Sequence, residues 1–233
     1  MSAVADNLAA IRTRIESACR RAGRSPADVS LVAVSKLQPA ALVREAYAAG
    51  QRDFGENYAQ ELRDKAAELS DLPDIRWHAI GPLQSNKAKY VAAGAFAFHA
   101  LDRLEVAREL SRRRRDAPLR CFLEINLAAE ETKGGVSGAD APRLADAVRA
   151  LPNLQLVGLM ALPPPSPDAE SSRPYFRMLR ELGARIGVPE LSMGTTFDYE
   201  IAVEEGATCV RVGTAIFGER PVKSPSAAAG PRR

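Results

Sequence analysis

A lysine ends the first strongly apolar run of the sequence, LVAVSK at residues 31–36. Such a run is typical of a strand buried on one or both faces, where an ammonium group is costly without a partner or a role. Lys36 has the parity of Val34 and Val32, so we expect it at the end of this strand on their face. A lysine in a dry site loses its proton more easily and forms a Schiff base with an aldehyde; the alternative is a lysine that extends from a strand end into water.

Two later segments have the composition of a phosphate site. SMGTTFD at residues 192–198 and VRVGTAIFG at residues 210–218 each lie at a predicted strand end and are rich in Gly, Ser and Thr. Small residues leave backbone N–H groups accessible, and with hydroxyls they can surround a phosphate. Thr196, Gly213 and Thr214 are the best candidates, although turns need glycine for other reasons too.

Arg211 lies in an otherwise apolar strand, between Val210 and Val212. One interpretation is that its guanidinium binds a phosphate or faces a heteroaromatic nitrogen. The other is that it forms an internal salt bridge with Glu124. The sequence favours neither interpretation.

Further polar residues lie at predicted strand ends, namely Asn57, His78, Glu124 and Asn126. We interpret His99 as a core histidine with a hydrogen-bond partner. The sequence contains no Ser-His-Asp set, metal-ligand cluster or Walker motif, so a metal site would consist almost entirely of carboxylates.

The elements that position these residues alternate between apolar runs and helical patterns. This alternation predicts parallel strands joined by crossovers, and eight such units favour a single (β/α)8 TIM barrel, in which all strand carboxyl ends face one cavity. A doubly wound open sheet is the alternative. Too few residues follow the last strand for a full outer helix, so we expect the N-terminal helix, about residues 3–22, to cover that gap. The predicted strands are residues 30–36, 51–57, 74–81, 95–102, 119–127, 154–162, 190–194 and 207–218.

Composition gives little indication of binding partners and some indication of the cellular compartment. The 233 residues favour one domain, and a net charge of +3 gives no strong tendency toward nucleic acid or an anionic membrane. Three widely spaced cysteines suit reduced thiols better than a disulfide framework, and the amphipathic N-terminus lacks the apolar core of a signal peptide. No segment is long and apolar enough for a membrane span. We therefore expect a cytoplasmic protein.

Residues 1–221 are predicted to form the barrel domain. Three segments are expected to lie at the periphery of the protein. The first is residues 222–233, predicted to be a disordered tail because it has no periodic apolar face. RRRR at residues 112–115 is predicted to be an exposed helix end, and the stiff loop PPPSPD is predicted to lead into a helix near Asp168.

Several motifs, in order and along nearly the whole chain, resemble the pyridoxal phosphate homeostasis protein family. They are AVSK, FGENYAQE, WHAIGPLQSNK, INLAAEETKGGV, GLMAL and LSMGTTFDYEIAVEEGATCVRVGTAIFG. The family fold is a single TIM barrel similar to the cofactor domain of alanine racemase. The resemblance implies that Lys36 holds pyridoxal 5′-phosphate (PLP) as a Schiff base. The other cofactor-binding residues that it implies are Asn57, His78, Ile80, Met193, Gly194, Thr196, Arg211, Gly213 and Thr214, with Thr196, Gly213 and Thr214 on the phosphate and Asn57, His78 and Ile80 around the ring.

Two positions depart from the family pattern. The family usually has GMS where this chain has Gly194, Thr195 and Thr196, so a threonine would supply the phosphate hydroxyl. A bulky aromatic residue is usual at Ala79, whose parity directs it away from His78 and Ile80, so we expect altered packing more than altered cofactor binding.

The resemblance implies a PLP-binding protein that acts in vitamin B6 and amino-acid homeostasis and is not an efficient racemase. A racemase needs a base on the opposite face of its substrate, which similar racemases take from a second, β-rich domain. The alternatives are a PLP-dependent enzyme acting on amino acids, with His78 or Tyr58 as acid or base, and a sugar-phosphate-binding barrel without PLP. PLP-dependent apoenzymes are the implied partners, neither nucleic acid nor a membrane is expected, and a monomer is expected.

Overall fold

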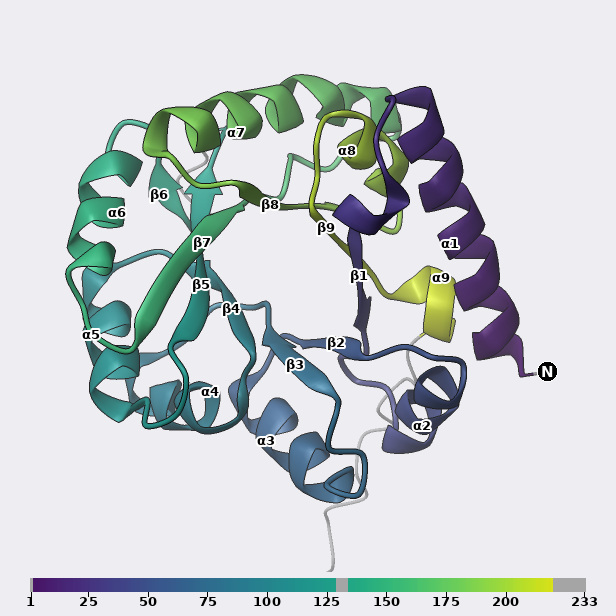
Figure 1. Ribbon diagram of the computed structural model, residues 1–233, viewed down its shortest axis with the longest axis horizontal. Helices are drawn as coiled ribbons and strands as arrows, with labels where there is room; N and C mark the ends of the chain where they lie inside the picture. Colours follow the sequence, from purple (N-terminus) through teal and green to yellow (C-terminus); the bar gives the residue numbers. More distant parts are fainter. Residues whose placement is uncertain (1, 129–133, 220–233) are drawn as a thin grey trace, which may run out of the picture.

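The computed structural model describes residues 2–128 and 134–219. Within them, eight parallel strands pair in the order β1-β2-β3-β4-β5-β7-β8-β9, and β9 pairs with β1 to close a barrel (Figure 1). The predicted single (β/α)8 barrel is therefore confirmed, and the open-sheet alternative is wrong. The strands are β1 (Ser30–Val34), β2 (Asp53–Glu56), β3 (Arg76–Ala79), β4 (Ala97–Leu101), β5 (Leu119–Asn126), β7 (Leu154–Met160), β8 (Glu190–Thr195) and β9 (Cys209–Val212).

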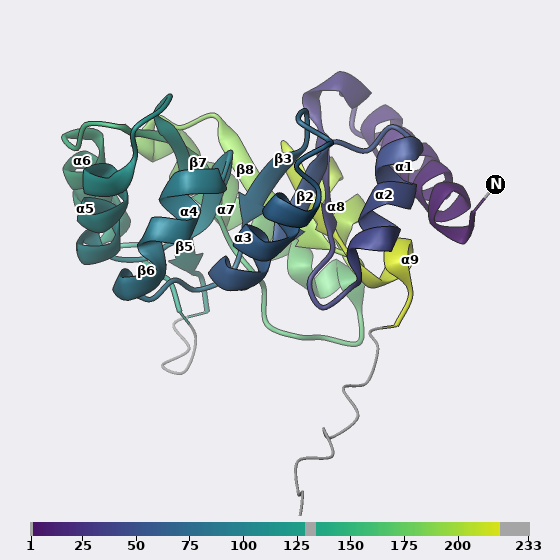
Figure 2. The same cartoon turned by 90° about the horizontal axis from the view of Figure 1, so that it is seen from below.

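Helices surround this barrel on its outer side (Figures 1 and 2). They are α1 (Ala3–Arg21), α2 (Ala40–Ala48), α3 (Ala59–Glu68), α4 (Ala88–Gly94), α5 (Leu104–Arg113), α6 (Ala141–Arg149), α7 (Arg173–Ile186), α8 (Tyr199–Glu204) and α9 (Thr214–Phe217). Short 3-10 turns are η1 (Pro26–Asp28), η2 (Ser85–Lys87) and η3 (Ala169–Ser172), and the short strand β6 (Val136–Ser137) pairs with β5 outside the barrel.

The N-terminal helix α1 covers the gap beside the short helix α9, as predicted. Its buried side chains recur at helical spacing, with Val4, Leu8, Ile11 and Ile15 on one face. Ser2 caps its first turn by accepting from the N–H of Ala5. The buried face packs against α2, α8 and α9 (Figure 1), so the first helix in the chain closes the ring at its last strand.

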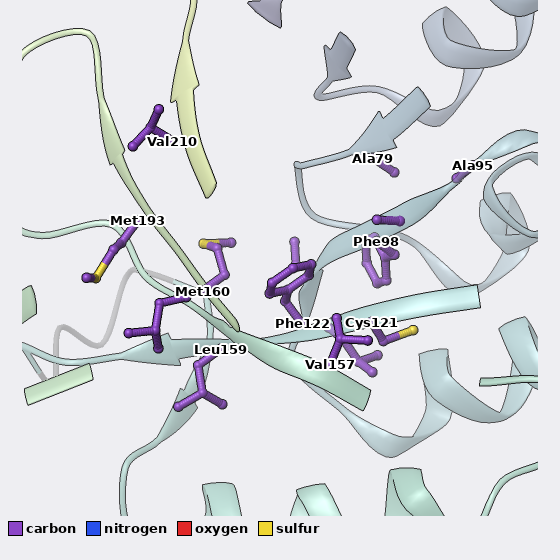
Figure 3. Close-up of a cluster of buried hydrophobic side chains, with 14 of the residues drawn as sticks. Ala79, Ala95, Phe98, Cys121, Phe122, Val157, Leu159, Met160, Met193 and Val210 are labelled. Atoms are coloured by element: carbon purple, nitrogen blue, oxygen red, sulfur yellow. The ribbon is translucent and has the colours of Figure 1, made fainter. Parts of the chain in front are cut away.

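Side-chain alternation divides the interior into two layers. On β1, Leu31 and Ala33 belong to the hydrophobic cluster between strands and helices, whereas Val34 faces a cavity inside the barrel. Figure 3 shows part of that outer cluster, with Phe98 and Leu159 among its fully buried members. Alternation of this kind allows each strand to serve the core with one face and the barrel interior with the other.

The remaining sequence predictions concern surface segments. Arg112 and Arg113 lie in the last turn of α5, where both pair with Glu109, in agreement with a charged helix end. Asp168 caps η3, which continues into α7 at Arg173. The tail predicted at residues 222–233 lies outside the described residues.

The cysteines form no cross-link to one another among the described residues. Cys19, Cys121 and Cys209 are all free and buried. Among the described residues, no helix has both the length and the apolar character needed to cross a membrane.

Replacing Leu8 with alanine tests how far the barrel depends on α1. Leu8 is fully buried, so we expect the free energy of unfolding to fall by about 2–5 kcal/mol in urea titrations. The control is Thr13→Ala on the exposed face, which should change it by less than about 0.5 kcal/mol. Equal effects of the two changes would contradict the observed packing.

Candidate functional site

The carboxyl ends of the strands surround a cavity of about 290 Å³, which we call the Lys36 cavity. Its wall contains residues that follow β1, β2, β3, β7 and β9, together with residues near the ends of β5 and β8. The lining residues are Val34, Lys36, Gln38, Asn57, Ile80, Gly81, Pro82, Glu124, Leu162, Thr195, Thr196, Phe197, Arg211, Gly213, Thr214 and Gly218.

Seven of the ten residues expected to bind a cofactor line this cavity. They are Lys36, Asn57, Ile80, Thr196, Arg211, Gly213 and Thr214. They come from segments up to 178 residues apart in sequence, from residue 36 to residue 214, and only barrel closure brings them together. The fold thus combines an amine, a guanidinium, hydroxyls and a small-residue turn in one wall.

Lys36 follows β1 by two residues and is half-buried on the same side as Val34. A second lysine, Lys65 of α3, holds the backbone just before it by donating to the Ser35 carbonyl. Just after it, the N–H of Leu37 donates to Glu61 Oε1 at 2.6 Å. Leu37 has φ of 61°, a left-handed conformation that is unfavourable for a residue with a side chain. Two side chains of α3, Lys65 and Glu61, therefore hold the backbone on both sides of Lys36.

The Lys65 ammonium is itself buried among acidic groups. It lies 2.8 Å from Glu56 Oε1 and 2.8 Å from Glu61 Oε1, and the Ser35 hydroxyl donates to the same Glu56 oxygen. Burial raises the pKa of Glu56 to about 7, although the nearby Lys65 ammonium acts in the opposite direction. Within the described residues, the second oxygen of Glu56 is buried without a hydrogen-bond partner, which favours the protonated acid further. Glu61 is the second carboxyl group in contact with Lys65.

Thr196 joins the two loops that are rich in small residues. Its Oγ1 accepts the backbone N–H of Gly213 at 3.3 Å. Asp198 shapes the same loop, because its Oδ1 accepts from the N–H of Thr195 at 2.8 Å and from the Thr195 hydroxyl at 3.1 Å. A side chain at Gly213 would come within 3.1 Å of the Val34 carbonyl, so the small residue lets the turn approach β1. The Thr196 hydroxyl proton remains suited to donate to an anion in the cavity.

The loops after β2 and β3 touch at Asn57 and Gly81. A Cβ atom at Gly81 would lie 2.4 Å from the Asn57 carbonyl oxygen, closer than any real contact. Only glycine allows this approach, which fixes Asn57 beside Ile80 in the cavity wall.

Arg211 contributes a buried cation to the wall. Among the described residues, its guanidinium donates to Ser192 Oγ and, at 3.2 Å, to the Ala161 carbonyl, and it forms no ion pair with Glu124. Burial lowers the pKa of Arg211 and raises that of Glu124, a second residue of the same wall. The internal salt bridge considered from the sequence is therefore not formed.

Three expected cofactor residues lie away from the cavity wall. His78 is buried below it and bonds to Asp53 and His99. Met193 projects from the opposite face of β8 into the hydrophobic cluster (Figure 3). Gly194 has φ of 89°, and a Cβ there would lie 2.5 Å from the Ala202 side chain, so this glycine serves the approach of β8 to α8.

Sequence reasoning missed two groups of residues near the site. Leu162 and Phe197 line the cavity and are about half exposed, with 49% and 56% of their surface accessible. Glu56 and Lys65 hold the turn of Lys36. Lys65 lies three residues after the buried Leu62 on the same face of α3, but its charge is typical of an exposed side chain, so the sequence did not single it out.

Residues 7–221 match the family "Alanine racemase, N-terminal domain". Alanine racemase of Corynebacterium glutamicum has the same fold, with a TM-score of 0.65 at 17% identity over 97% of this chain and 63% of that one. The class defined by fold and site is thus a racemase-like barrel. A protein of Pseudomonas aeruginosa named pyridoxal phosphate homeostasis protein is 49% identical over 97% of this chain and 100% of its own length.

The chain belongs to the pyridoxal phosphate homeostasis protein family, as its motifs predicted. Among solved structures, PipY of Synechococcus elongatus with PLP bound superimposes with a TM-score of 0.80 at 36% identity, over 92% of this chain and 100% of that one.

Replacing Glu56 with glutamine should alter the pH dependence of stability. A carboxyl group with a pKa of about 7 in the folded protein and about 4.5 when unfolded binds more protons in the folded state between these values. Folding stability should therefore fall as pH rises through that window, by an amount of the order of 1–3 kcal/mol, and Glu56→Gln should abolish this fall. Urea titrations at pH 5 and pH 8 measure it.

The control for this prediction is Glu181→Gln, which changes an exposed carboxyl group on α7. It should keep the wild-type pH dependence. If the Glu56 variant did so as well, Glu56 would be ionised throughout the window.

Proposed function

We propose that the Lys36 cavity binds PLP and that Lys36 forms a Schiff base with its aldehyde. One observation carries the proposal: Lys36, Thr196 and Arg211 share one cavity wall. An amine for an aldehyde, a hydroxyl and small-residue turn for a phosphate, and a cation for an anionic ligand are the groups that this cofactor requires. PLP bound to the related PipY protein supports the assignment.

The chemistry of the wall fits the cofactor's parts. Thr196 and Gly213 are held together at one end by their own hydrogen bond, which leaves a hydroxyl suited to a phosphate oxygen. Val34 and Ile80 offer apolar contacts for a ring, and Lys36 extends from β1 beside them. The neutral amine of Lys36 is the reactive form: its lone pair attacks the aldehyde carbon, and water leaves when the C=N bond forms.

The proposed role is to hold PLP for vitamin B6 and amino-acid homeostasis, without efficient racemase activity. The two residues considered as acid or base in an enzyme are not in the cavity wall, since His78 is buried below it and Tyr58 is 57% exposed outside it. The relatives named pyridoxal phosphate homeostasis protein support the same role.

Partners and location complete the proposal. The half-exposed Leu162 and Phe197 leave the cavity open at its mouth, which suits release of PLP to PLP-dependent apoenzymes. A monomer and a cytoplasmic location are proposed with it.

Replacing Lys36 with alanine tests the covalent link. We expect the visible band of bound PLP to disappear, and borohydride to trap no adduct, while weak binding through the phosphate remains. Absorption spectra followed by peptide mass mapping measure this. The control is the exposed Lys89→Ala, which should retain a trapped adduct on Lys36. A full-strength band in the Lys36 variant would refute the Schiff base.

Replacing Thr196 with alanine tests the phosphate grip separately. Losing a hydrogen bond to a charged group should weaken PLP retention by about tenfold, without moving the absorbance maximum. Thr196→Ser keeps the hydroxyl and should bind within about twofold of the wild type. Dialysis against buffer with absorbance detection measures retention, and unchanged retention in the alanine variant would remove Thr196 from the site.

A further inference from the structure

A chain of buried polar side chains crosses the barrel interior and ends at the Lys36 cavity. Asp53 starts it at the first residue of β2, on the side of the barrel opposite the cavity. His78 of β3, His99 of β4 and Ser192 of β8 follow, and Arg211 of β9 ends it in the cavity wall. All five residues are buried. Only Arg211 has a role in the proposed function.

Each link of this chain is a hydrogen bond. Asp53 Oδ1 lies 2.9 Å from His78 Nε2, and His78 Nδ1 lies 2.9 Å from His99 Nε2. His99 Nδ1 lies 2.7 Å from Ser192 Oγ, which also accepts from the Arg211 guanidinium. Both ring nitrogens of both histidines are therefore used, and neither ring can be turned over without losing two bonds.

The two ends of the chain favour one direction of donation. A carboxylate only accepts and a guanidinium only donates. With neutral rings, His78 donates from Nε2 to Asp53 and accepts at Nδ1 from His99 Nε2–H. His99 then accepts the hydroxyl proton of Ser192, and the Ser192 oxygen accepts from Arg211. Every proton is used, and every link donates toward Asp53.

A protonated His78 would allow the opposite direction between His78 and Ser192. His78 would donate to His99, and His99 would donate to Ser192, whose oxygen would then take two donors and whose own proton would lose its acceptor in the chain. Leaving that buried hydroxyl proton without an acceptor in the series disfavours this arrangement. Burial, together with the charges of His78, Arg211 and Arg120, lowers the pKa of His99 well below its usual value, so His99 is neutral in either arrangement.

Packing holds the middle of the chain in place. The ring of Phe122 stacks on His99 with centroids 4.3 Å apart, and Phe96 contacts the ring of His78 edge-on with centroids 5.5 Å apart. At the acidic end, burial would raise the pKa of Asp53, but hydrogen bonds from His78 and Arg76 outweigh it and lower that pKa. Asp53 therefore stays a carboxylate and an obligatory acceptor.

We propose that Asp53, His78, His99 and Ser192 are positioning residues that fix the Arg211 guanidinium in the wall of the Lys36 cavity. Because the Ser192 proton is committed to His99, the Ser192 oxygen presents lone pairs to Arg211 and orients it. The Ala161 carbonyl holds the second guanidinium nitrogen at 3.2 Å, so the cation is anchored at two points. The identity of the anionic ligand that this cation faces, PLP, rests on the proposed function.

The sequence contains only two histidines, and both belong to the hydrogen-bonded series from Asp53 to Arg211. Nitrogen NMR of histidine-labelled protein without PLP therefore reports on this chain alone. We expect two neutral rings at pH 7, each carrying its proton on Nε2. A proton on Nδ1 of either ring, or a charged ring, would overturn the proposed direction.

Two variants break the chain at opposite ends, each with a matched control. Ser192→Ala removes the link to Arg211. Its control, Ser111→Ala, removes a buried hydroxyl of α5 that donates to the Pro152 carbonyl, away from the hydrogen-bonded series. Asp53→Asn lets an amide donate to His78, and Asp74→Asn changes an exposed carboxylate that pairs with Arg52. Only Ser192→Ala and Asp53→Asn should alter the histidine spectrum, the second toward mixed tautomers.

Titration with PLP then tests positioning. We expect the dissociation constant to rise about tenfold in Ser192→Ala and about threefold in Asp53→Asn, with both controls within about twofold of the wild type. Unchanged PLP affinity in both Ser192→Ala and Asp53→Asn would mean that the hydrogen-bonded series serves only the fold, and would overturn the proposal. Asp53→Asn is nearly isosteric, so it remains informative if Ser192→Ala does not fold.

Failure of the proposed function would have a different signature. A wild-type protein that binds no PLP, yet has both histidines protonated on Nε2, would refute the cofactor assignment. Hydrogen exchange of the Arg211 guanidinium would then decide the positioning role: faster exchange in Ser192→Ala than in Ser111→Ala would support it, and equal exchange would overturn it.

Discussion

The burial of the Lys65 ammonium constrains the whole neighbourhood of Lys36. Three oxygens surround this charge, and they belong to the turn after β1, to β2 and to α3. Removing one partner of a buried charge leaves it uncompensated, which is strongly destabilising, so the three elements must meet in one arrangement. The turn with Lys36 lies between Ser35 and Leu37, both bonded to this cluster. Correct folding of β2 and α3 thus presents the amine to the cavity.

Much of this arrangement follows from simple periodicities in the sequence. The eight barrel strands were predictable because the candidate strands alternate with helical patterns along the chain, and eight such units favour closure. Parity placed Lys36 with Val34, and both line the cavity. Thr196 and Gly213 were predictable as neighbours because parallel strands bring their carboxyl ends to the same edge, and the two residues are hydrogen-bonded.

The depth of a side chain inside the barrel was not predictable. Parity gives His78 and Ile80 the same inward direction, yet only Ile80 reaches the cavity, because His78 lies one layer lower on β3. That layer depends on the stagger between strands, which no local pattern encodes. Met193 shows the complementary limit: it follows Ser192, which faces inward, and alternation therefore directs its side chain into the outer hydrophobic cluster.

Leu37 holds a left-handed backbone conformation in the turn that carries Lys36. A non-glycine residue in that conformation costs of the order of 1 kcal/mol, and here Glu61 and Lys65 supply the bonds that hold it. Glycine would relieve the cost, but it would also give the chain beside Lys36 more freedom. Glycine would thus exchange strain in the folded turn for entropy in the unfolded chain, two effects of similar size. Leucine at this position restricts the backbone next to Lys36, and the bonds from Glu61 and Lys65 offset its strain.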